Sequence, residues 1–121
     1  MKYILTHQRN KIARVVLEYQ AKTCIRMVPH KGEKHHINFM REGMVCSSPL
    51  GMQLGKNNVD MGYSCSWGSL AHEVMHSLGF FHEHTRSDRD NYITINWNNV
   101  PGKRVHRFKS LKRAKISIFS Q

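Results

Sequence analysis

The stretch SLAHEVMHSLGFFHEHTRSDRDNYI, residues 69–93, holds four of the chain's nine histidines. Two of these, His72 and His76, are four residues apart. A helix would place both imidazoles on one face, about one turn from each other. This spacing indicates a metal site, and Glu73 lies directly beside the first histidine.

The surrounding sequence predicts a helix from Trp67 to Leu78, with Ser64 or Ser66 as its N-cap. Gly79 can take the left-handed conformation that ends a helix, so the chain is expected to return and bring His82 to the same point. Three neutral imidazoles leave one position of a tetrahedral zinc ion open for water. That is the arrangement of a catalytic zinc rather than a structural one.

The chemistry follows from charge. Zinc lowers the pKa of its bound water from about 15.7 to near 7, and Glu73 is the candidate general base. HExxH alone also arises by chance in amphipathic helices. HExxHxxGxxH is far more specific because it fixes five positions in eleven. The competing interpretation is two surface histidines and an unrelated third.

Upstream of this segment, a helix is expected from His7 to Lys22. Its apolar face consists of Ile12, Val15, Val16 and Tyr19. Strands are expected at TCIRMVP (23–29) and HHINFM (35–40). Each segment contains β-branched residues in rough alternation and is bounded by Pro, Gly or charged residues. Residues 41–56 predict a loop with room for one brief strand, and NNVDMG (57–62) predicts a further short strand.

Composition limits the chain to one continuous domain, since 121 residues with 40% hydrophobic content can form one real core. No apolar run approaches the roughly 20 residues of a bilayer-spanning helix, and the first residues lack the apolar region of a secretory signal.

The net charge is +11, and the sequence from Gly102 onward carries seven Lys or Arg and no acid. Such a run can bind nucleic acid, heparin-like polyanions or anionic membrane. The alternative is a solvated chain end. No nucleic-acid motif accompanies the run, so no specific nucleic acid is expected.

Three cysteines, Cys24, Cys46 and Cys65, allow one intrachain disulfide and leave one thiol. The odd number indicates an intermolecular bond, a reduced cytosolic protein or a missing piece of chain. The cysteines by themselves leave these alternatives open.

HEVMHSLGFFHEHTRSDRDNYI (72–93) resembles the extended zinc signature of the astacin family of metalloendopeptidases, HExxHxxGFxHExxRxDRDxxI, with each fixed position present. HQRNKIARVVLEYQAKTCIRMVP is similar to the family's first helix and following strand, and YITINWNNVPGKRVHRF to its segment after the signature. The resemblance covers roughly Ile4 to Phe108.

The resemblance implies an α+β fold: the upper lobe of a metzincin, with a twisted mixed sheet, a backing helix and an active-site zinc helix. An edge strand of that sheet would bind an extended peptide by strand addition; residues 57–62 are the expected edge, and the alternative for them is a loop. The implied site residues are His72, His76 and His82 as ligands of one Zn²⁺ per chain, Glu73 as general base and Gly79 as the turn residue.

The end of the signature is expected to form a salt-bridged structural knot, made of Arg86, Asp88, Arg89 and Asp90. Glu83 matches a residue near the new N-terminus of mature family members, where it acts as a structural charge partner or in catalysis. The resemblance also implies a disulfide between Cys46 and Cys65, and a partner for Cys24 that this sequence does not contain.

The sequence departs from the family after the signature. No methionine follows Met75 and no tyrosine follows Tyr92, so the Met-turn, the tyrosine near the zinc and the second lobe are expected to be missing, together with the signal and pro-segment. We expect residues 1–110 to be a partial catalytic domain and residues 111–121 a basic tail of unrelated sequence.

The resulting functional hypothesis is an extracellular zinc endopeptidase that acts on proteins or peptides. Two alternatives remain: an inert zinc-binding truncated product, and a polyanion-binding protein acting through its basic tail.

Overall fold

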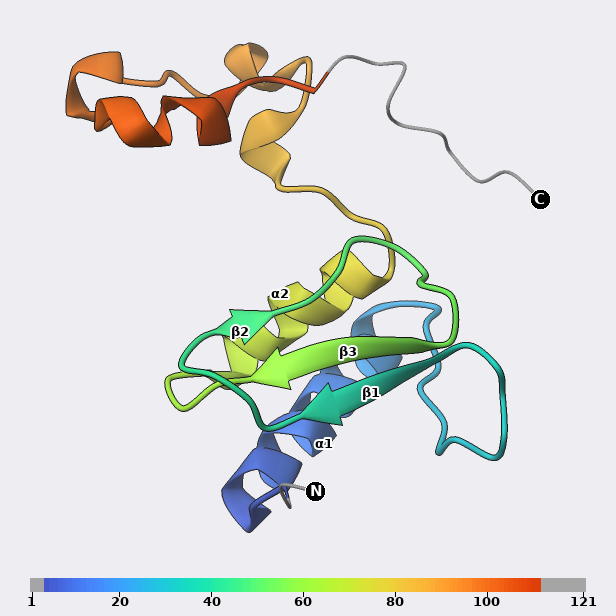
Figure 1. The fold of residues 1–121 in the computed structure, drawn as a ribbon. Helices are drawn as coiled ribbons and strands as arrows, with labels where there is room; N and C mark the ends of the chain where they lie inside the picture. Colours follow the sequence, from blue (N-terminus) through green and yellow to red (C-terminus); the bar gives the residue numbers. More distant parts are fainter. Residues whose placement is uncertain (1–3, 112–121) are drawn as a thin grey trace. The chain divides into compact units, whose positions relative to one another are not determined.

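The computed structural model describes residues 4–111, and the chain divides into two compact units, Met1–Phe80 and Phe81–Gln121. The expected basic tail therefore lies outside the described residues, apart from Leu111. Figure 1 shows the helices and strands of the first unit. Their bounds are α1 (Thr6–Lys22), β1 (His36–Met40), β2 (Cys46–Ser47), β3 (Lys56–Met61) and α2 (Trp67–Ser77). The fold class is α+β, as the sequence predicted.

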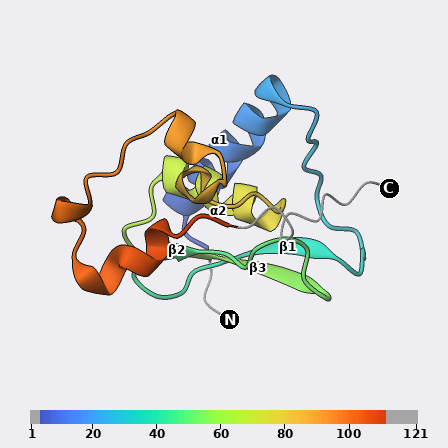
Figure 2. The same ribbon diagram turned by 90° about the horizontal axis from the view of Figure 1, so that it is seen from above.

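The strands form a three-stranded mixed sheet in the order β1-β3-β2. β1 runs parallel to β3 with His36 opposite Lys56, and β2 runs antiparallel to it with Cys46 opposite Met61. Figure 2 shows that α1 and α2 lie on one face of this sheet. Side chains of β3 alternate between buried and more exposed positions, because successive residues of a strand point to opposite faces.

The core lies between the sheet and the two helices. Its fully buried members are Val15 from α1, Val59 and Met61 from β3, and Leu70 and Val74 from α2. Ile12 and Tyr19 pack against this cluster, which confirms the predicted apolar face of α1 except at Val16, a half-buried residue outside the cluster. The Tyr19 hydroxyl also donates a hydrogen bond to the Ala71 carbonyl at 2.9 Å, which ties α1 to α2.

The prediction of a strand at residues 23–29 is wrong. The alternation is present, with Ile25 and Met27 half-buried between exposed neighbours, but no described strand pairs with the segment. Polar backbone groups of this segment form hydrogen bonds with nearby residues instead. The Thr23 hydroxyl accepts from the Ile25 amide at 3.0 Å, and Arg26 donates to the Thr23 carbonyl at 2.8 Å.

The remaining strand predictions hold, with one correction. Residues 35–40 contain β1, residues 57–62 contain most of β3, and the brief strand inside the 41–56 loop is β2. The expectation that residues 57–62 form an edge strand is wrong, because β3 is the central strand and pairs on both sides. Sheet order depends on contacts between distant segments, which periodicity along one segment does not report.

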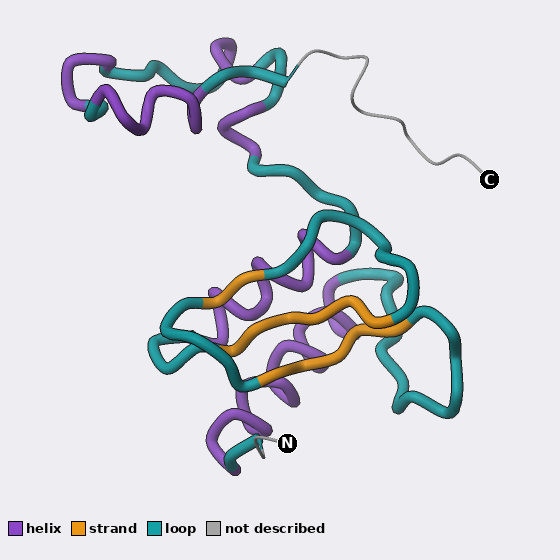
Figure 3. The backbone as a smooth tube through the Cα atoms, viewed as in Figure 1, coloured by secondary structure: helices purple, strands orange, loops and turns teal. Residues whose placement is uncertain are grey.

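The second unit, from Phe81 onward, consists of loops and short 3-10 helices in its described part (Figure 3). These helices are η1 (Glu83–Thr85), η2 (Arg89–Asn91), η3 (Trp97–Asn99) and η4 (Gly102–Phe108). Arg89 is buried at its centre, where it donates to the carbonyls of His84 and Phe108. Within residues 4–111, no helix has both the length and the apolar content to span a bilayer.

Candidate metal centre

Both ends of α2 are fixed by local hydrogen bonds. At the start, the Ser66 side chain accepts from the Ser69 amide at 3.0 Å, so Ser66 is the N-cap. At the end, the Phe80 amide donates to the Met75 carbonyl at 3.0 Å and the Gly79 amide to the His76 carbonyl at 2.9 Å. This pair of bonds is a Schellman motif. It requires the left-handed conformation that Gly79 adopts, with a φ of 98°.

The helix presents two imidazoles together, as the four-residue spacing predicted. The rings of His72 and His76 are 4.5 Å apart between centroids and lie edge to face. The His76 Nδ1 is 2.7 Å from the Phe80 carbonyl oxygen. Because a carbonyl only accepts, Nδ1 carries the proton and the Nε2 lone pair of a neutral ring is left for a metal.

A third histidine joins this pair. One side-chain nitrogen each from His72, His76 and His82 all lie within 4.8 Å of one another. Three imidazole nitrogens are a donor set that suits zinc, so the side chains present fit the metal. Within residues 4–111, this is the one group of three or more potential ligands that close together.

Glu73 lies next to His72 at the surface of the first unit. Both side chains line an open depression of about 510 Å³, together with residues of β2 and the loop before α2. The Glu73 residue itself is only 9% exposed. A carboxylate held at the wall of such a depression can accept a proton from a molecule bound there.

The loop before β3 braces the end of α2, which the sequence did not reveal. The Gly51 amide donates to the His76 carbonyl at 2.7 Å, and the buried Asn57 side chain donates to the Gly51 carbonyl at 3.2 Å. The hydroxyls of Ser48 and Ser77 are hydrogen-bonded at 2.8 Å. The two contacts that reach α2 join positions about 25 to 30 residues apart, and no local pattern marks them.

The disulfide implied by the family resemblance is present. Cys46 of β2 is bonded to Cys65, with 5.3 Å between their Cα atoms. The bond holds the short strand β2 against the start of α2, where the depression lies. Cys24 is a free, exposed thiol.

Charged residues at the end of the signature pair within the second unit. Arg86 donates to Asp88 at 2.8 and 2.9 Å and to Glu83 at 3.0 Å. Hydrogen bonds from Arg86 to Asp88 and then to Glu83 raise the pKa of the Arg86 guanidinium. The nearly buried Arg89 contacts Asp90 at 3.2 Å. The ion pairs of the expected knot therefore form, although all their partners except Arg89 are well exposed.

A mixed sheet backed by two helices, the second carrying HExxHxxGxxH, defines a domain of the zinc-metalloproteinase class. The family model described as Astacin, a peptidase family, matches residues 2–121, and the chain belongs to this family.

Two zinc metalloproteinases are similar to the chain in sequence, in agreement with this assignment. Zinc metalloproteinase nas-7 of Caenorhabditis elegans is 34% identical over 116 residues, which are 95% of this chain and 30% of that protein. Zinc metalloproteinase nas-13 of the same organism is 42% identical over 97 residues, covering 78% of this chain and 21% of that protein. The chain thus spans less than a third of the length of these relatives.

A solved structure is also similar. High choriolytic enzyme 1, a hatching enzyme zinc-protease from the medaka fish Oryzias latipes, superposes with a TM-score of 0.79 at 32% sequence identity. The match covers 90% of this chain and 55% of that chain.

Proposed function

We propose that the chain is part of the catalytic domain of a zinc-dependent endopeptidase that hydrolyses peptide bonds in proteins. The observation that carries the proposal is the convergence of three histidine nitrogens within 4.8 Å, next to a carboxylate in an open depression. The names of the similar proteins support it, since each is a zinc protease.

In this proposal His72, His76 and His82 hold one zinc ion per chain. When bound, zinc supplies Lewis-acid activation of a water molecule and of the substrate carbonyl. The His76 Nδ1–H bond to Phe80 orients the ring and leaves Nε2 as the unprotonated nitrogen, the form that coordinates a metal. Gly79 lets the chain turn immediately after α2. His82 follows this turn at a short distance along the sequence.

Glu73 acts as the general base that removes a proton from the attacking water and passes it to the leaving amine. Its low exposure supports this role, because a carboxylate shielded from solvent interacts more strongly with charges that develop beside it. Glu83 is proposed as a structural charge partner of Arg86 rather than a second catalytic carboxylate, since the two pair at 3.0 Å.

A peptide substrate has a plausible backbone partner in β2. Within residues 4–111, this strand pairs with β3 on one side only, and Cys46 of β2 lines the same depression as His72 and Glu73. An extended peptide lying along the outer edge of β2 would therefore pass the proposed base. The disulfide of β2 also fits an oxidising compartment, and we propose an extracellular location.

Cleavage of a denatured protein substrate tests the function in a chimera that extends this chain with the remaining part of the hatching enzyme's chain, with zinc content measured in parallel. Glu73→Ala should abolish chelator-sensitive cleavage and leave zinc binding intact, since the carboxylate is not a proposed ligand. Glu42→Ala is the matched control, because it removes an exposed carboxylate outside the depression. Cleavage that survives Glu73→Ala would contradict the role of Glu73.

Bound zinc without any cleavage by this chimera would instead favour the inert zinc-binding product. Retention on heparin that is lost on deletion of residues 103–121 would favour the polyanion-binding alternative.

A further inference from the structure

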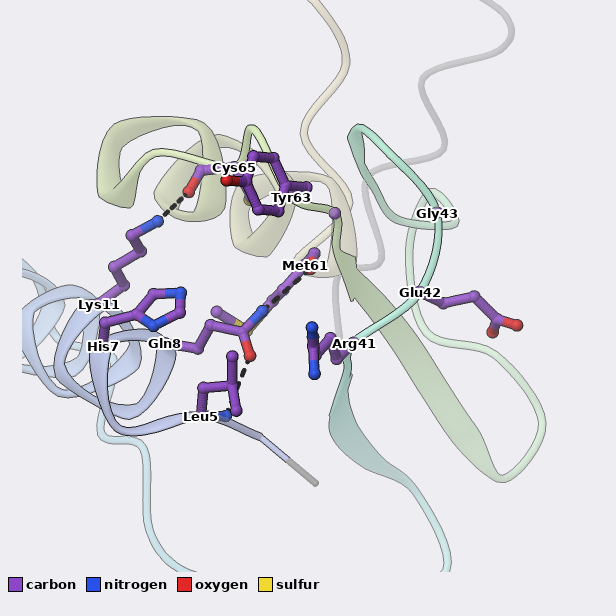
Figure 4. Close-up of a pocket in the computed structure, with 11 residues that line it drawn as sticks. Leu5, His7, Gln8, Lys11, Arg41, Glu42, Gly43, Met61, Tyr63 and Cys65 are labelled. Atoms are coloured by element: carbon purple, nitrogen blue, oxygen red, sulfur yellow. Dashed lines mark hydrogen bonds between the residues drawn. The ribbon is translucent and has the colours of Figure 1, made fainter. Parts of the chain in front are cut away.

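A second cavity, of about 310 Å³, lies in the first unit outside the metal centre. Figure 4 shows it between the first turns of α1, the residues that follow β1 and the segment between β3 and α2. Its size falls in the range of small-molecule sites, about 300 to 1,000 Å³. None of the proposed zinc ligands lines it.

Hydrogen bonds fix the floor of this cavity. The Gln8 residue is 4% exposed, and its side chain accepts from the Leu5 amide at 3.1 Å and donates to the Met61 carbonyl at 3.3 Å. Lys11 donates to the Cys65 carbonyl at 2.6 Å. An ammonium group has three donors, so Lys11 is held in place and keeps two donors for another molecule.

Positive charge is concentrated around this floor. Lys11, Arg41 and the imidazole of His7 all line the cavity. Among residues 4–111, none of these three side chains forms an ion pair with an acidic group. The one acidic lining residue is Glu42, and Figure 4 shows its carboxylate turned away from the other labelled side chains.

We propose that this cavity binds the oxyanion group of a small organic molecule, a carboxylate or a phosphate. The guanidinium of Arg41 offers the paired donors that bind either group in bidentate geometry. Lys11 supplies a second positive charge, and Leu5 and Met61 supply apolar surface for the body of the ligand. The site is independent of the proposed peptidase activity, since none of its groups belongs to the metal centre.

Isothermal titration calorimetry of the 121-residue chain with inorganic phosphate and with citrate tests the site, and circular dichroism checks that each variant is folded. Arg41→Gln should weaken binding of the preferred probe about tenfold, as expected for loss of a charge-assisted bidentate contact. Arg9→Gln is the matched control. It removes the same charge from an exposed position on α1 that does not line the cavity, and should change affinity less than about twofold.

The comparison of probes distinguishes the two ligand chemistries. Tighter binding of phosphate would assign a phosphate ester, and tighter binding of citrate a carboxylate. Equal weakening in Arg41→Gln and Arg9→Gln would mean only diffuse attraction to a basic protein, and would overturn the proposal. Absence of binding of both probes at millimolar concentration would overturn it as well.

Discussion

At the scale of single residues, His76 shows how a proposed zinc ligand can be oriented by groups that would not touch the metal. Its Nδ1 is bonded to the Phe80 carbonyl, while its own carbonyl accepts from the amides of Gly51 and Gly79. Ring and backbone are therefore both constrained. Such supporting contacts commonly change metal affinity by 10- to 100-fold, so we expect the zinc affinity of the proposed site to depend on the loop around Gly51 as well as on the histidines.

The first prediction concerns zinc content. The chain should retain about one zinc ion, and His76→Ala should lower the affinity by orders of magnitude because only two imidazoles remain. His30→Ala is the control, since His30 is exposed and far along the sequence from the signature. Elemental analysis after dialysis against a chelator measures the difference. Equal zinc content in the wild type and in single variants of all three histidines would disprove the site.

At the scale of elements, local sequence patterns predicted the helices, because helix formation depends on residues close together in the sequence. The period of apolar residues placed α1, and the capping serine and Gly79 placed α2, each to within one residue at each end; the four-residue spacing paired His72 with His76. Residues 23–29 show the limit of such patterns. Their rough alternation is typical of a strand, but a strand also needs a neighbour, and the sheet order β1-β3-β2 is set by contacts between distant segments.

The same limit applies to the candidate site. Spacing could indicate three ligands and a base, because HExxHxxGxxH is a local pattern. It could not indicate the bond from the Gly51 amide to the His76 carbonyl, because that contact joins segments far apart in the sequence. The disulfide could be predicted from the family resemblance, but not from the cysteines alone. It closes a loop with a sequence separation of 19, and a loop of that length corresponds to roughly 3 kcal/mol of stabilisation.

The second prediction tests the end of α2. Gly79→Ala should destabilise the first unit by about 1–2 kcal/mol, because a Cβ disfavours the left-handed conformation. The cost is conformational, since an added Cβ at this position would meet no atom within 4 Å. Urea unfolding measures it. Gly68→Ala is the matched control, because Gly68 lies inside α2 and has no positive φ, so that substitution should be neutral or stabilising.

The third prediction uses the contact between α1 and α2. Burial raises the pKa of Tyr19 above its ordinary value of 10.0. The folded state therefore holds the phenol proton more tightly than the unfolded state. This contribution to stability is fully present below about pH 10 and declines as the pH rises toward the folded-state pKa.

Tyr19→Phe removes the hydroxyl bonded to Ala71 and should cost about 1 kcal/mol at neutral pH. The difference between the wild type and this variant should shrink as the pH rises above about 10. Unfolding by urea at a series of pH values measures both effects. Tyr63→Phe, at a position 86% exposed, should show neither. A difference that grows with pH would contradict the assignment.

At the scale of the whole molecule, the chain carries the zinc signature but only part of the length of its relatives. It spans 55% of the medaka hatching enzyme and 30% of the nematode protein nas-7. Ligand positions within about 0.5 Å of productive geometry require supporting contacts on every side. The first unit supplies the brace at Gly51 and the disulfide at Cys46. Neither of these two contacts would hold a bound substrate from the side opposite β2.

The last prediction follows from that asymmetry. A peptide lying along β2 would be held mainly from one side, and misplacement by about 1 Å can cost 100-fold in rate. We therefore expect the 121-residue chain to bind zinc and to cleave casein weakly or not at all. A chimera that appends the remaining part of the hatching enzyme's chain should show chelator-sensitive cleavage that Glu73→Ala abolishes. Because zinc content and circular dichroism are measured on both proteins, loss of folding can be separated from loss of positioning. Strong cleavage by the short chain that depends on Glu73 would show that positioning from one side suffices. A folded, zinc-loaded chimera without cleavage would count against the endopeptidase itself.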